Sequence, residues 1–414
     1  RGKGSAGNMQ YRFSDRVQAL KPSAIREIFK YASRPGMISL SAGNPAPEAF
    51  PVKEIAEISE KILRERPVDA LQYSVTEGYP PLREHLAAYL RRKYGIGRGF
   101  DGLLVTSGAQ QVMDLLAKSV LNEGDTVLCE SPSFIGSLNT FRSYRARLRG
   151  VPMEADGMNM DALERALEEE KNVRFIYTIP NFQNPTGITT SMEKRRRMYE
   201  LAKAHGVLIL EDNPYGDLRF AGEDVPAVKT LDEAGLVVYA GTFSKVVAPG
   251  IRVGYCVAPE EILQKMVVCK QGEDVHTNVW GQIVCHELMT GYDYEAHLRR
   301  LKEIYRRKAK VAADALDRYL APNVTYLPIQ GGLFFWCTLP EGENMPAFCK
   351  NAVLHNVCVV PGSAFLTNEA QPCSSFRINY TTPADDALVK GIRILGGLAN
   401  PRPAGGTEPP AALL

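Results

Sequence analysis

Short apolar runs alternate with helical patterns through the middle of the chain. Four runs rich in Val, Ile, Leu and Tyr cover residues 124–131, 173–181, 206–213 and 235–242, and such runs are typical of buried strands. A helical pattern over residues 81–95 begins at a proline and ends at a glycine, which favour a helix start and a helix end. Strands that alternate with helices are typical of a largely parallel sheet covered by helices. The pattern therefore predicts an α/β fold.

The pattern changes after about residue 290. A long charged helix is predicted over 294–318, followed by mixed strands within 331–339 and 374–381 and a last helix from Pro383. We interpret this part as a smaller α+β domain, because 414 residues exceed one ordinary core. The predicted organisation is an expression remnant at 1–8, an N-terminal segment at 9–40 that joins the small domain, a large domain at 41–290, the small domain at 291–398 and a loose tail at 399–414.

Charge and cysteine usage narrow the class of protein. The chain has 49 Lys and Arg against 47 Asp and Glu, a formal net charge of +2, so no overall field attracts nucleic acid or a membrane surface. No apolar run approaches the ~18 residues of a membrane span. The eight cysteines are scattered without a CxxC pair, which argues against disulfides or a metal site and favours a reducing, cytoplasmic location. Basic runs at 194–197 and 299–310 fall in helical patterns and are predicted to be solvated helix faces.

Polar or aromatic side chains follow each of the four predicted strands. Phe134 comes after the first strand, and Asn184 lies in a turn after the second. Asp212 and Tyr215 follow the third strand, and Lys245 follows the fourth. In open α/β sheets, ligands bind beyond the carboxyl ends of the strands. We therefore expect these side chains to meet in one polar site.

A further segment has the pattern of an anion site. Residues 107–110, Ser-Gly-Ala-Gln, lie where a predicted strand becomes a helix. Small residues there let backbone N–H groups approach an anion at the helix N-terminus. Thr242, Ser244 and Arg252 offer hydroxyl and guanidinium donors to the same anion.

Each of these residues also has an ordinary structural explanation. A loop lysine such as Lys245 is usually solvated, Asp212 suits a helix cap, and residues 184–187 form a good turn. In the strand pattern of residues 374–381, Arg377 falls on the face opposite its apolar neighbours, which suits an outward arginine. Their joint order along the chain, rather than any single residue, favours a functional site.

Several segments of this chain occur together in one known family. They are YSVTEGYPPLREHLA (73–87), TSGAQQ, PNFQNPTG, EDNPYGDLRF, GTFSKVVAPGIRVGY and FRINYT. From about residue 11 to about residue 397 the chain resembles the class I aminotransferases, fold type I enzymes that use pyridoxal 5′-phosphate. It is most similar to the branch that contains 2-aminoadipate and kynurenine aminotransferases and the effector domains of MocR-type regulators. Only a few residues precede Tyr11, so the DNA-binding domain of those regulators is expected to be absent.

The resemblance implies the architecture as well as the cofactor. It implies a large domain with a mostly parallel seven-stranded sheet between helices, together with a smaller α+β domain. It also implies a homodimer with shared active sites, in which Tyr73 reaches the cofactor phosphate of the other subunit.

The resemblance further implies a role for each candidate residue. Lys245 matches the lysine that forms a Schiff base with the cofactor aldehyde, and Asp212 matches the carboxylate that pairs with the pyridinium nitrogen. Tyr215 and Asn184 match the groups that bond the ring oxygen, and Phe134 matches the aromatic residue stacked on the ring. The phosphate cup is implied to contain Gly108, Ala109, Gln110, Thr242, Ser244 and Arg252. The site of the substrate α-carboxylate is implied to contain Arg377, with Asn184 and Gly43 beside it.

The implied activity is transfer of an amino group from an L-amino acid to a 2-oxo acid, expected to be 2-oxoglutarate, by a ping-pong mechanism. Relatives that act on aminoadipate or kynurenine often carry an arginine where this chain has Leu20, which favours aliphatic or aromatic donors. Arg16, Lys21 and Arg26 lie nearby as substitute cations. The same residues also suit a lyase or decarboxylase, because the scaffold does not decide which bond breaks, or a weakly active cofactor-binding sensor. Transamination is the preferred hypothesis.

Overall fold

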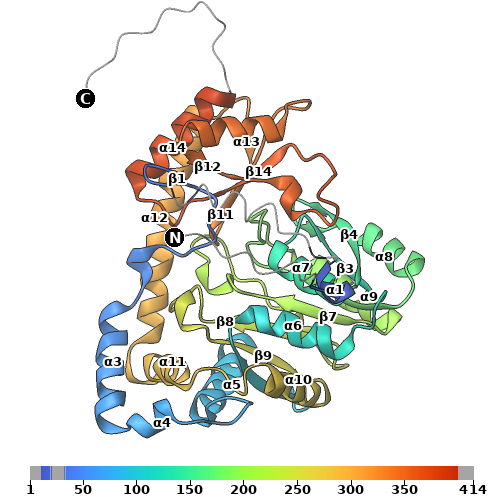
Figure 1. The fold of residues 1–414 in the computed structure, drawn as a ribbon, viewed down its shortest axis with the longest axis vertical. Coiled ribbons are helices and arrows are strands. Elements are labelled where there is room, and N and C mark those ends of the chain that lie inside the picture. Colours follow the sequence, from blue (N-terminus) through green and yellow to red (C-terminus); the bar gives the residue numbers. More distant parts are fainter. Residues whose placement is uncertain (1–10, 19, 21–31, 33, 400–414) are drawn as a thin grey trace, which may run out of the picture.

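Figure 1 shows the computed structural model, which describes residues 11–18, 20, 32 and 34–399. Its largest sheet is mostly parallel, with the order β2-β9-β8-β7-β6-β3-β4-β5. The central pairs β3–β4, β3–β6, β6–β7 and β7–β8 are parallel, whereas β9 pairs antiparallel with β8 and β2. The strands are β2 (Asp101–Thr106), β3 (Thr126–Ser131), β4 (Arg147–Glu154), β5 (Gly157–Met158), β6 (Val173–Thr178), β7 (Leu208–Asp212), β8 (Val237–Thr242) and β9 (Gly254–Pro259).

The four strand-type runs of the sequence form β3, β6, β7 and β8, so this part of the prediction is confirmed. The expected number of seven strands differs from the structure by the short edge strand β5. This strand pairs antiparallel with the end of β4, Met153 opposite Met158 and Glu154 opposite Gly157. Only two residues separate the paired positions, and Gly157 adopts a positive φ of 123° at the end of this tight turn. A strand of two residues carries no periodic signal from which it could be predicted.

Helices cover both faces of this sheet, as the apolar strands require. On one face, Leu128 and Ile176 join a cluster with Leu163 and Met198 of two covering helices. On the other face, alternate residues such as Val127 join the larger core beneath α5, α6 and α11. The helices of this region are α3 (Val52–Glu65), α4 (Pro67–Leu71), α5 (Pro80–Tyr94), α6 (Ala109–Val120), α7 (Ile135–Ser143), α8 (Met160–Glu169), α9 (Met192–His205), α10 (Glu260–Glu273) and α11 (Val279–Gly291).

A smaller antiparallel sheet, β10-β11-β14-β13, follows in the chain after the long helix α12. Its helices and strands are α12 (Tyr294–Tyr319), β10 (Thr325–Tyr326), β11 (Phe334–Thr338), α13 (Met345–Leu354), β13 (Val360–Pro361), β14 (Ser375–Asn379) and α14 (Asp385–Ala399). Near the N-terminus, β1 (Ile38–Ser39) pairs parallel with β12 (Val357–Cys358) of this region. The contact supports the expected joining of the N-terminal segment to the small domain, although the domain boundaries themselves stay a prediction. Residues 1–8 and 400–414 lie outside the described residues.

Short helical elements complete the described part of the chain. They are α1 (Asp15–Gln18), η1 (Pro47–Ala49), η2 (Gly216–Leu218), η3 (Val228–Leu231), η4 (Pro249–Ile251) and η5 (Gly362–Phe365). None of the described helices is both long and apolar enough to span a bilayer.

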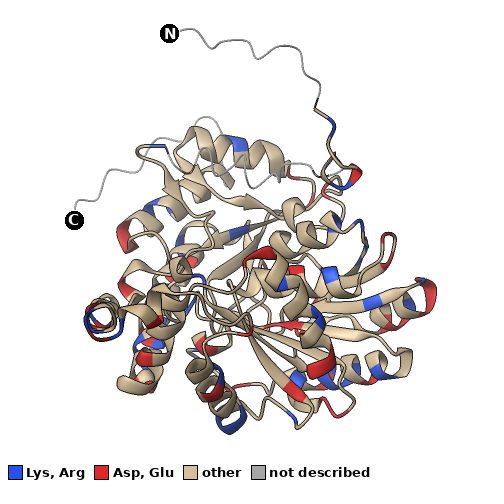
Figure 2. Ribbon diagram, turned by 60° about the horizontal axis from the view of Figure 1, so that its bottom comes forward, with Lys and Arg blue, Asp and Glu red and all other residues tan. Residues whose placement is uncertain are grey.

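The charged residues are distributed over many helices and loops with both signs interspersed (Figure 2). Two basic residues of the predicted solvated faces are nevertheless buried, which corrects that expectation. Arg195 is fully buried because its guanidinium donates to the carbonyl oxygens of Thr190 and Pro180 and to Asn181. Lys308 is buried beside Asp385. Sequence periodicity does not reveal such polar pockets, because they form only when distant loops meet.

Candidate active site

A cavity of about 330 Å³ lies at the carboxyl ends of the central strands. Its position agrees with the general location of ligand sites in open α/β sheets. Most of the predicted site residues line it, from segments that are far apart in the chain. They are Gly43, Ala109, Gln110, Phe134, Asn184, Asp212, Tyr215, Thr242, Ser244, Lys245, Arg252 and Arg377.

One end of the cavity has the features of an anion cup. The N-terminus of α6 lies here, preceded by Gly108 with a positive φ of 79°. A Cβ atom at Gly108 would lie 2.1 Å from Arg252 Nη2, so only glycine lets the guanidinium pack on this turn. Thr242 Oγ1 donates to Ser244 Oγ at 2.9 Å, and Arg252 Nη1 approaches Ser244 Oγ at 3.4 Å. Hydroxyl, guanidinium and helix N-terminus together favour a phosphate group.

Two predicted residues of this cup lie differently from the others. The side-chain amide of Gln110 donates to Gly136 O and Thr140 Oγ1 on α7, so these two hydrogen bonds are made within the protein. Tyr73 does not line the cavity of its own chain. Its side chain is 81% exposed and contacts the edge of His276.

Asp212, at the end of β7, lines the cavity and has one carboxylate oxygen that is not hydrogen-bonded within the described residues. Its Oδ2 accepts a hydrogen bond of 2.8 Å from the Tyr177 hydroxyl, whereas Oδ1 is buried without a partner among the described residues. Burial raises the pKa of Asp212 to about 7, and Tyr177 and Lys245 oppose that rise. An orphaned buried oxygen is destabilising unless a ligand pairs with it.

Lys245 is the half-buried amine of the site. Its Nζ donates to the carbonyl oxygen of Gly43 at 2.8 Å. Burial, together with the positive charges of Arg377 and Arg252, lowers the pKa of Lys245 to about 8, and the charge of Asp212 opposes that shift. Roughly a tenth of this amine is therefore neutral at pH 7 and about half at pH 8, far more than for a lysine of ordinary pKa, and the neutral form is the one that acts as nucleophile or base.

Arg377 is buried rather than outward, so the ordinary explanation of this residue is wrong. Its Nη1 donates to Asn184 Oδ1 and its Nη2 to Ser41 O, both at 2.7 Å. The guanidinium lies 4.2 Å from the ring centre of Phe334 and 5.0 Å from that of Phe365. Its Nε is buried without a partner within the described part of the chain. The geometry leaves this nitrogen available for an anionic group that enters the cavity.

The loop of Asn184 is anchored by a residue that is not among the predicted site residues. Glu130, at the end of β3, accepts hydrogen bonds from Thr178, Ile179 and Gln183. Burial raises the pKa of Glu130 to about 7. The sequence feature that indicates such a residue is an acid at the end of an apolar strand. A carboxylate that is buried there needs several hydrogen-bond donors around it.

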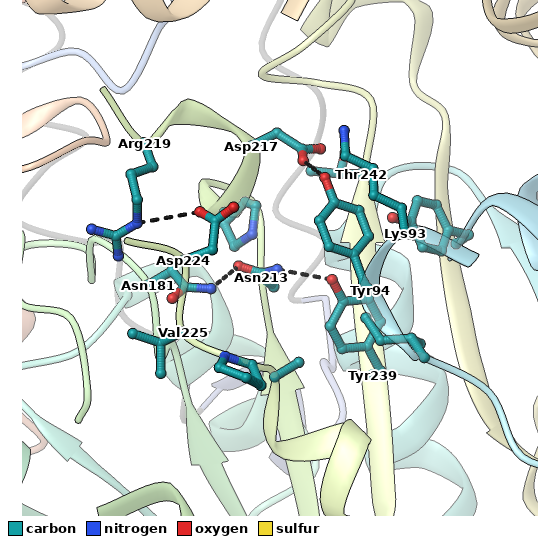
Figure 3. Close-up of a pocket in the computed structure, with 16 residues that line it drawn as sticks. Lys93, Tyr94, Asn181, Asn213, Asp217, Arg219, Asp224, Val225, Tyr239 and Thr242 are labelled. Atoms are coloured by element: carbon teal, nitrogen blue, oxygen red, sulfur yellow. Dashed lines mark hydrogen bonds and ion pairs between the residues drawn. The ribbon is translucent and has the colours of Figure 1, made fainter. Parts of the chain in front are cut away.

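A second cavity, of about 240 Å³, is also lined by residues of the segment after β7, Asn213 and Asp217 among them (Figure 3). Its polar side chains pair with one another. Asn213 bridges Asn181 and Tyr239, and Tyr94 donates to Asp217. Among the described residues, none of the buried polar atoms without a partner belongs to this lining, whereas two of them, Asp212 Oδ1 and Arg377 Nε, belong to residues of the first cavity.

The first cavity fits pyridoxal 5′-phosphate. The cup at α6 suits the phosphate, the free Oδ1 of Asp212 suits a protonated ring nitrogen, and the amine of Lys245 suits an aldehyde. Phe134 lines the cavity and offers an aromatic face. Within the described ranges, no group of three or more His, Cys, Asp and Glu side chains is arranged to hold a metal ion.

Comparison with known proteins decides the family. The model of the family "aminotransferase class I and II" matches residues 35–392. This chain belongs to that family. It is an aminotransferase of the pyridoxal-phosphate fold type I, which confirms the resemblance, fold class, cofactor and enzyme class inferred from the sequence.

Three known proteins serve as examples of those to which this aminotransferase is similar. The 2-aminoadipate transaminase of Thermus thermophilus is 41% identical over 92% of this chain and 94% of its own length. The aromatic-amino-acid aminotransferase 1 of Thermococcus litoralis is 37% identical over 92% of this chain and 93% of its own. The structure of Pyrococcus horikoshii kynurenine aminotransferase in complex with PMP has a TM-score of 0.90 at 35% identity, covering 94% of this chain and 96% of that one.

Proposed function

We propose that this aminotransferase moves the amino group of an L-amino acid to a 2-oxo acid, with 2-oxoglutarate as the acceptor, in a ping-pong mechanism. The observation that carries the proposal is that Arg377, the one buried arginine among the described lining residues, lines the same cavity as Lys245 and Asp212. Arg377 can bind the α-carboxylate of only one substrate at a time beside the amine of Lys245. The amino donor and the 2-oxo acid acceptor would therefore occupy the same place one after the other, as a ping-pong mechanism requires.

The residues divide the work of the reaction. When bound, pyridoxal 5′-phosphate accepts the electrons released at the substrate Cα. Asp212 keeps a proton at the ring nitrogen through Oδ1, and Lys245 carries the proton between Cα and the cofactor carbon. Arg377 binds the α-carboxylate through Nε and its free Nη hydrogens, which orients the Cα–H bond. Tyr215 and Asn184 hold the ring oxygen.

We propose aliphatic or aromatic amino acids as the donors. Apolar side chains, Met113, Ile135 and Ile179 among them, line the cavity together with Phe134. The cations among its described lining residues are Lys245, Arg252 and Arg377, and each already has a proposed role. The described lining therefore offers no dedicated partner to a second carboxylate, which favours an apolar donor side chain. The distal carboxylate of the proposed acceptor, 2-oxoglutarate, would have to be bound by residues outside this described lining.

The N-terminal segment is also relevant to the class of amino donor. Leu20, which stands where an arginine occurs in relatives acting on aminoadipate or kynurenine, is 39% exposed. Lys21 and Arg26 lie outside the described residues, and Arg16 lies in the exposed helix α1. The donor class thus rests on the described cavity walls.

We also propose a homodimer whose subunits share their active sites, in a cytoplasmic location. Apolar side chains are exposed around Tyr73, namely Val68, Leu71 and Val75. Such a concentration is typical of a protein interface. None of the eight cysteines, all of which lie in the described part of the chain, forms a disulfide, which suits a reducing compartment.

An absorbance spectrum tests the proposed function. We expect visible absorbance from the loaded protein, which bleaches on addition of leucine, phenylalanine or tyrosine and returns with 2-oxoglutarate. Lys245→Ala should remain folded by circular dichroism and lose turnover by at least about 10³-fold, because it removes both the cofactor link and the proton carrier.

Other outcomes separate the alternatives. Release of ammonia, pyruvate or carbon dioxide without an acceptor would indicate a lyase or decarboxylase. Bleaching by no amino acid would contradict transamination and favour a sensor. Return of colour with another 2-oxo acid but not with 2-oxoglutarate would remove only the proposed acceptor.

A further inference from the structure

A chain of two hydroxyl groups ends on the carboxylate of the cofactor site. Ser137 on α7 donates to the Tyr177 hydroxyl at 2.9 Å, and Tyr177 on β6 donates to Asp212 Oδ2 at 2.8 Å. The three side chains are at most 5% exposed. A phenol within a buried strand needs a hydrogen-bond partner, and here that partner is one oxygen of Asp212.

We propose that Tyr177, oriented by Ser137, is a positioning residue that fixes the Asp212 carboxylate with Oδ1 toward the cofactor ring nitrogen and stabilises its charged form. The arrangement of the two oxygens supports this role. Oδ2 is held by Tyr177, whereas Oδ1 has no partner among the described residues. The inference rests on the cofactor assignment and not on the identity of the substrates.

The surrounding charges make a donor to Asp212 necessary. Burial disfavours its anion, and the buried carboxyl of Glu130 on β3 adds repulsion when it is ionised. Lys245 attracts the anion, but its nitrogen is engaged with the aldehyde once the cofactor is bound. Hydrogen bonds to a charged acceptor are the strong ones, and donors in series polarise one another. The two hydroxyl groups therefore supply a stabilisation that remains in the loaded protein.

The test is a pH titration of the visible absorbance of the cofactor-loaded protein, without any amino acid. Tyr177→Phe removes the donor, so Asp212 should bind a proton more tightly and draw it from the ring nitrogen. With less positive charge on the ring, the Lys245 nitrogen should keep its proton to higher pH, and the titration midpoint should rise by about 0.5–1 pH unit. The dissociation constant of the cofactor should rise by about tenfold, as expected for a lost charge-assisted hydrogen bond.

Two further variants make the titration specific. Ser137→Ala leaves the phenol in place but removes its donor, so the midpoint should rise by a smaller amount. Tyr199→Phe is the matched control, because Tyr199 is also a buried phenol that donates to a buried carboxylate, Asp232. Asp232 does not line the cofactor cavity. Its midpoint should equal that of the wild-type protein.

A cofactor analogue with CH in place of the ring nitrogen completes the test. Loaded with it, wild-type protein and Tyr177→Phe should have the same midpoint, because Asp212 then has no ring proton to hold. A folded Tyr177→Phe variant with the wild-type midpoint and affinity would overturn the proposal. So would a shift that persists with the analogue. If Tyr177→Phe does not fold, an unchanged midpoint in Ser137→Ala overturns it instead.

Discussion

At the scale of single residues, burial of Asp212 destabilises the protein that has no cofactor. The fold raises the pKa of this carboxyl from 3.8 to about 7. Between these two values the folded state holds a proton that the unfolded chain releases. Stability therefore falls as the pH rises from about 4 to about 7, and the loss persists at higher pH.

Replacement of this carboxyl by an amide should remove that pH dependence. In the cofactor-free protein, Asp212→Asn should raise the free energy of unfolding at pH 8 by up to about 4 kcal/mol, and by less at pH 5, because one pKa unit corresponds to about 1.4 kcal/mol. Denaturant unfolding at the two pH values measures both differences. Asp224→Asn is the control, because that carboxyl is 69% exposed. A gain at pH 8 no larger than at pH 5 would contradict the assignment.

The same variant should lose activity while it gains stability. An amide oxygen at this position does not hold the ring nitrogen as a cation, so the electron-accepting capacity of the cofactor should fall. The polar interior of the site is thus explained by the cofactor rather than by the fold, since Oδ1 of Asp212 and Nε of Arg377 have no partners among the described residues.

At the scale of elements, the contact between the start of β9 and the start of α6 shapes the phosphate cup. A Cβ atom on Gly254 would lie 2.6 Å from Gly108 C and 2.7 Å from Ala109 N. These are backbone atoms, which cannot yield by side-chain rotation. The glycine therefore lets the strand approach the helix N-terminus closely enough to form the cup.

Gly254→Ala should displace the N-terminus of α6 and weaken phosphate binding. We expect the dissociation constant of pyridoxal 5′-phosphate to rise by at least about tenfold, since the backbone donors of the cup act together with the helix dipole. Gly250→Ala is the matched control, because a Cβ atom there meets nothing within 4 Å. Equal cofactor affinity in both variants, measured by absorbance titration, would contradict this role of the contact.

The elements also show which features of the structure were predictable from the sequence. Buried strands of the parallel sheet are recognisable as apolar runs in the sequence. Asp212 and Lys245 follow two of these strands, so a shared site for them was predictable. The contact of Tyr177 with Asp212 was not predictable. A tyrosine inside an apolar strand cannot be distinguished from an ordinary core residue until the partner of its hydroxyl group is known. Arg195 was assigned to a solvated face for a related reason, since the carbonyl groups that bind it come from loops distant in the chain.

At the scale of the whole molecule, the position of Tyr73 decides whether one chain can complete its own site. Tyr73 is exposed and does not line the cavity of its own chain. If it serves the neighbouring subunit, an active site needs Lys245 from one chain and Tyr73 from the other. If sites are shared in this way, a mixture of two chains that are defective at different residues can form intact sites. If each chain completes its own site, such a mixture cannot.

Two inactive variants should restore each other when their subunits exchange. A mixed dimer of Tyr73→Ala and Lys245→Ala contains one site with both substitutions and one site with neither. Random pairing in equal amounts should therefore recover up to about a quarter of wild-type activity, measured as amino-group transfer after co-refolding. The control is the double variant mixed equally with wild-type protein, in which every mixed dimer should be inactive. Activity that only averages the two components in both mixtures would show that each chain completes its own site, and the shared-site dimer would then be wrong.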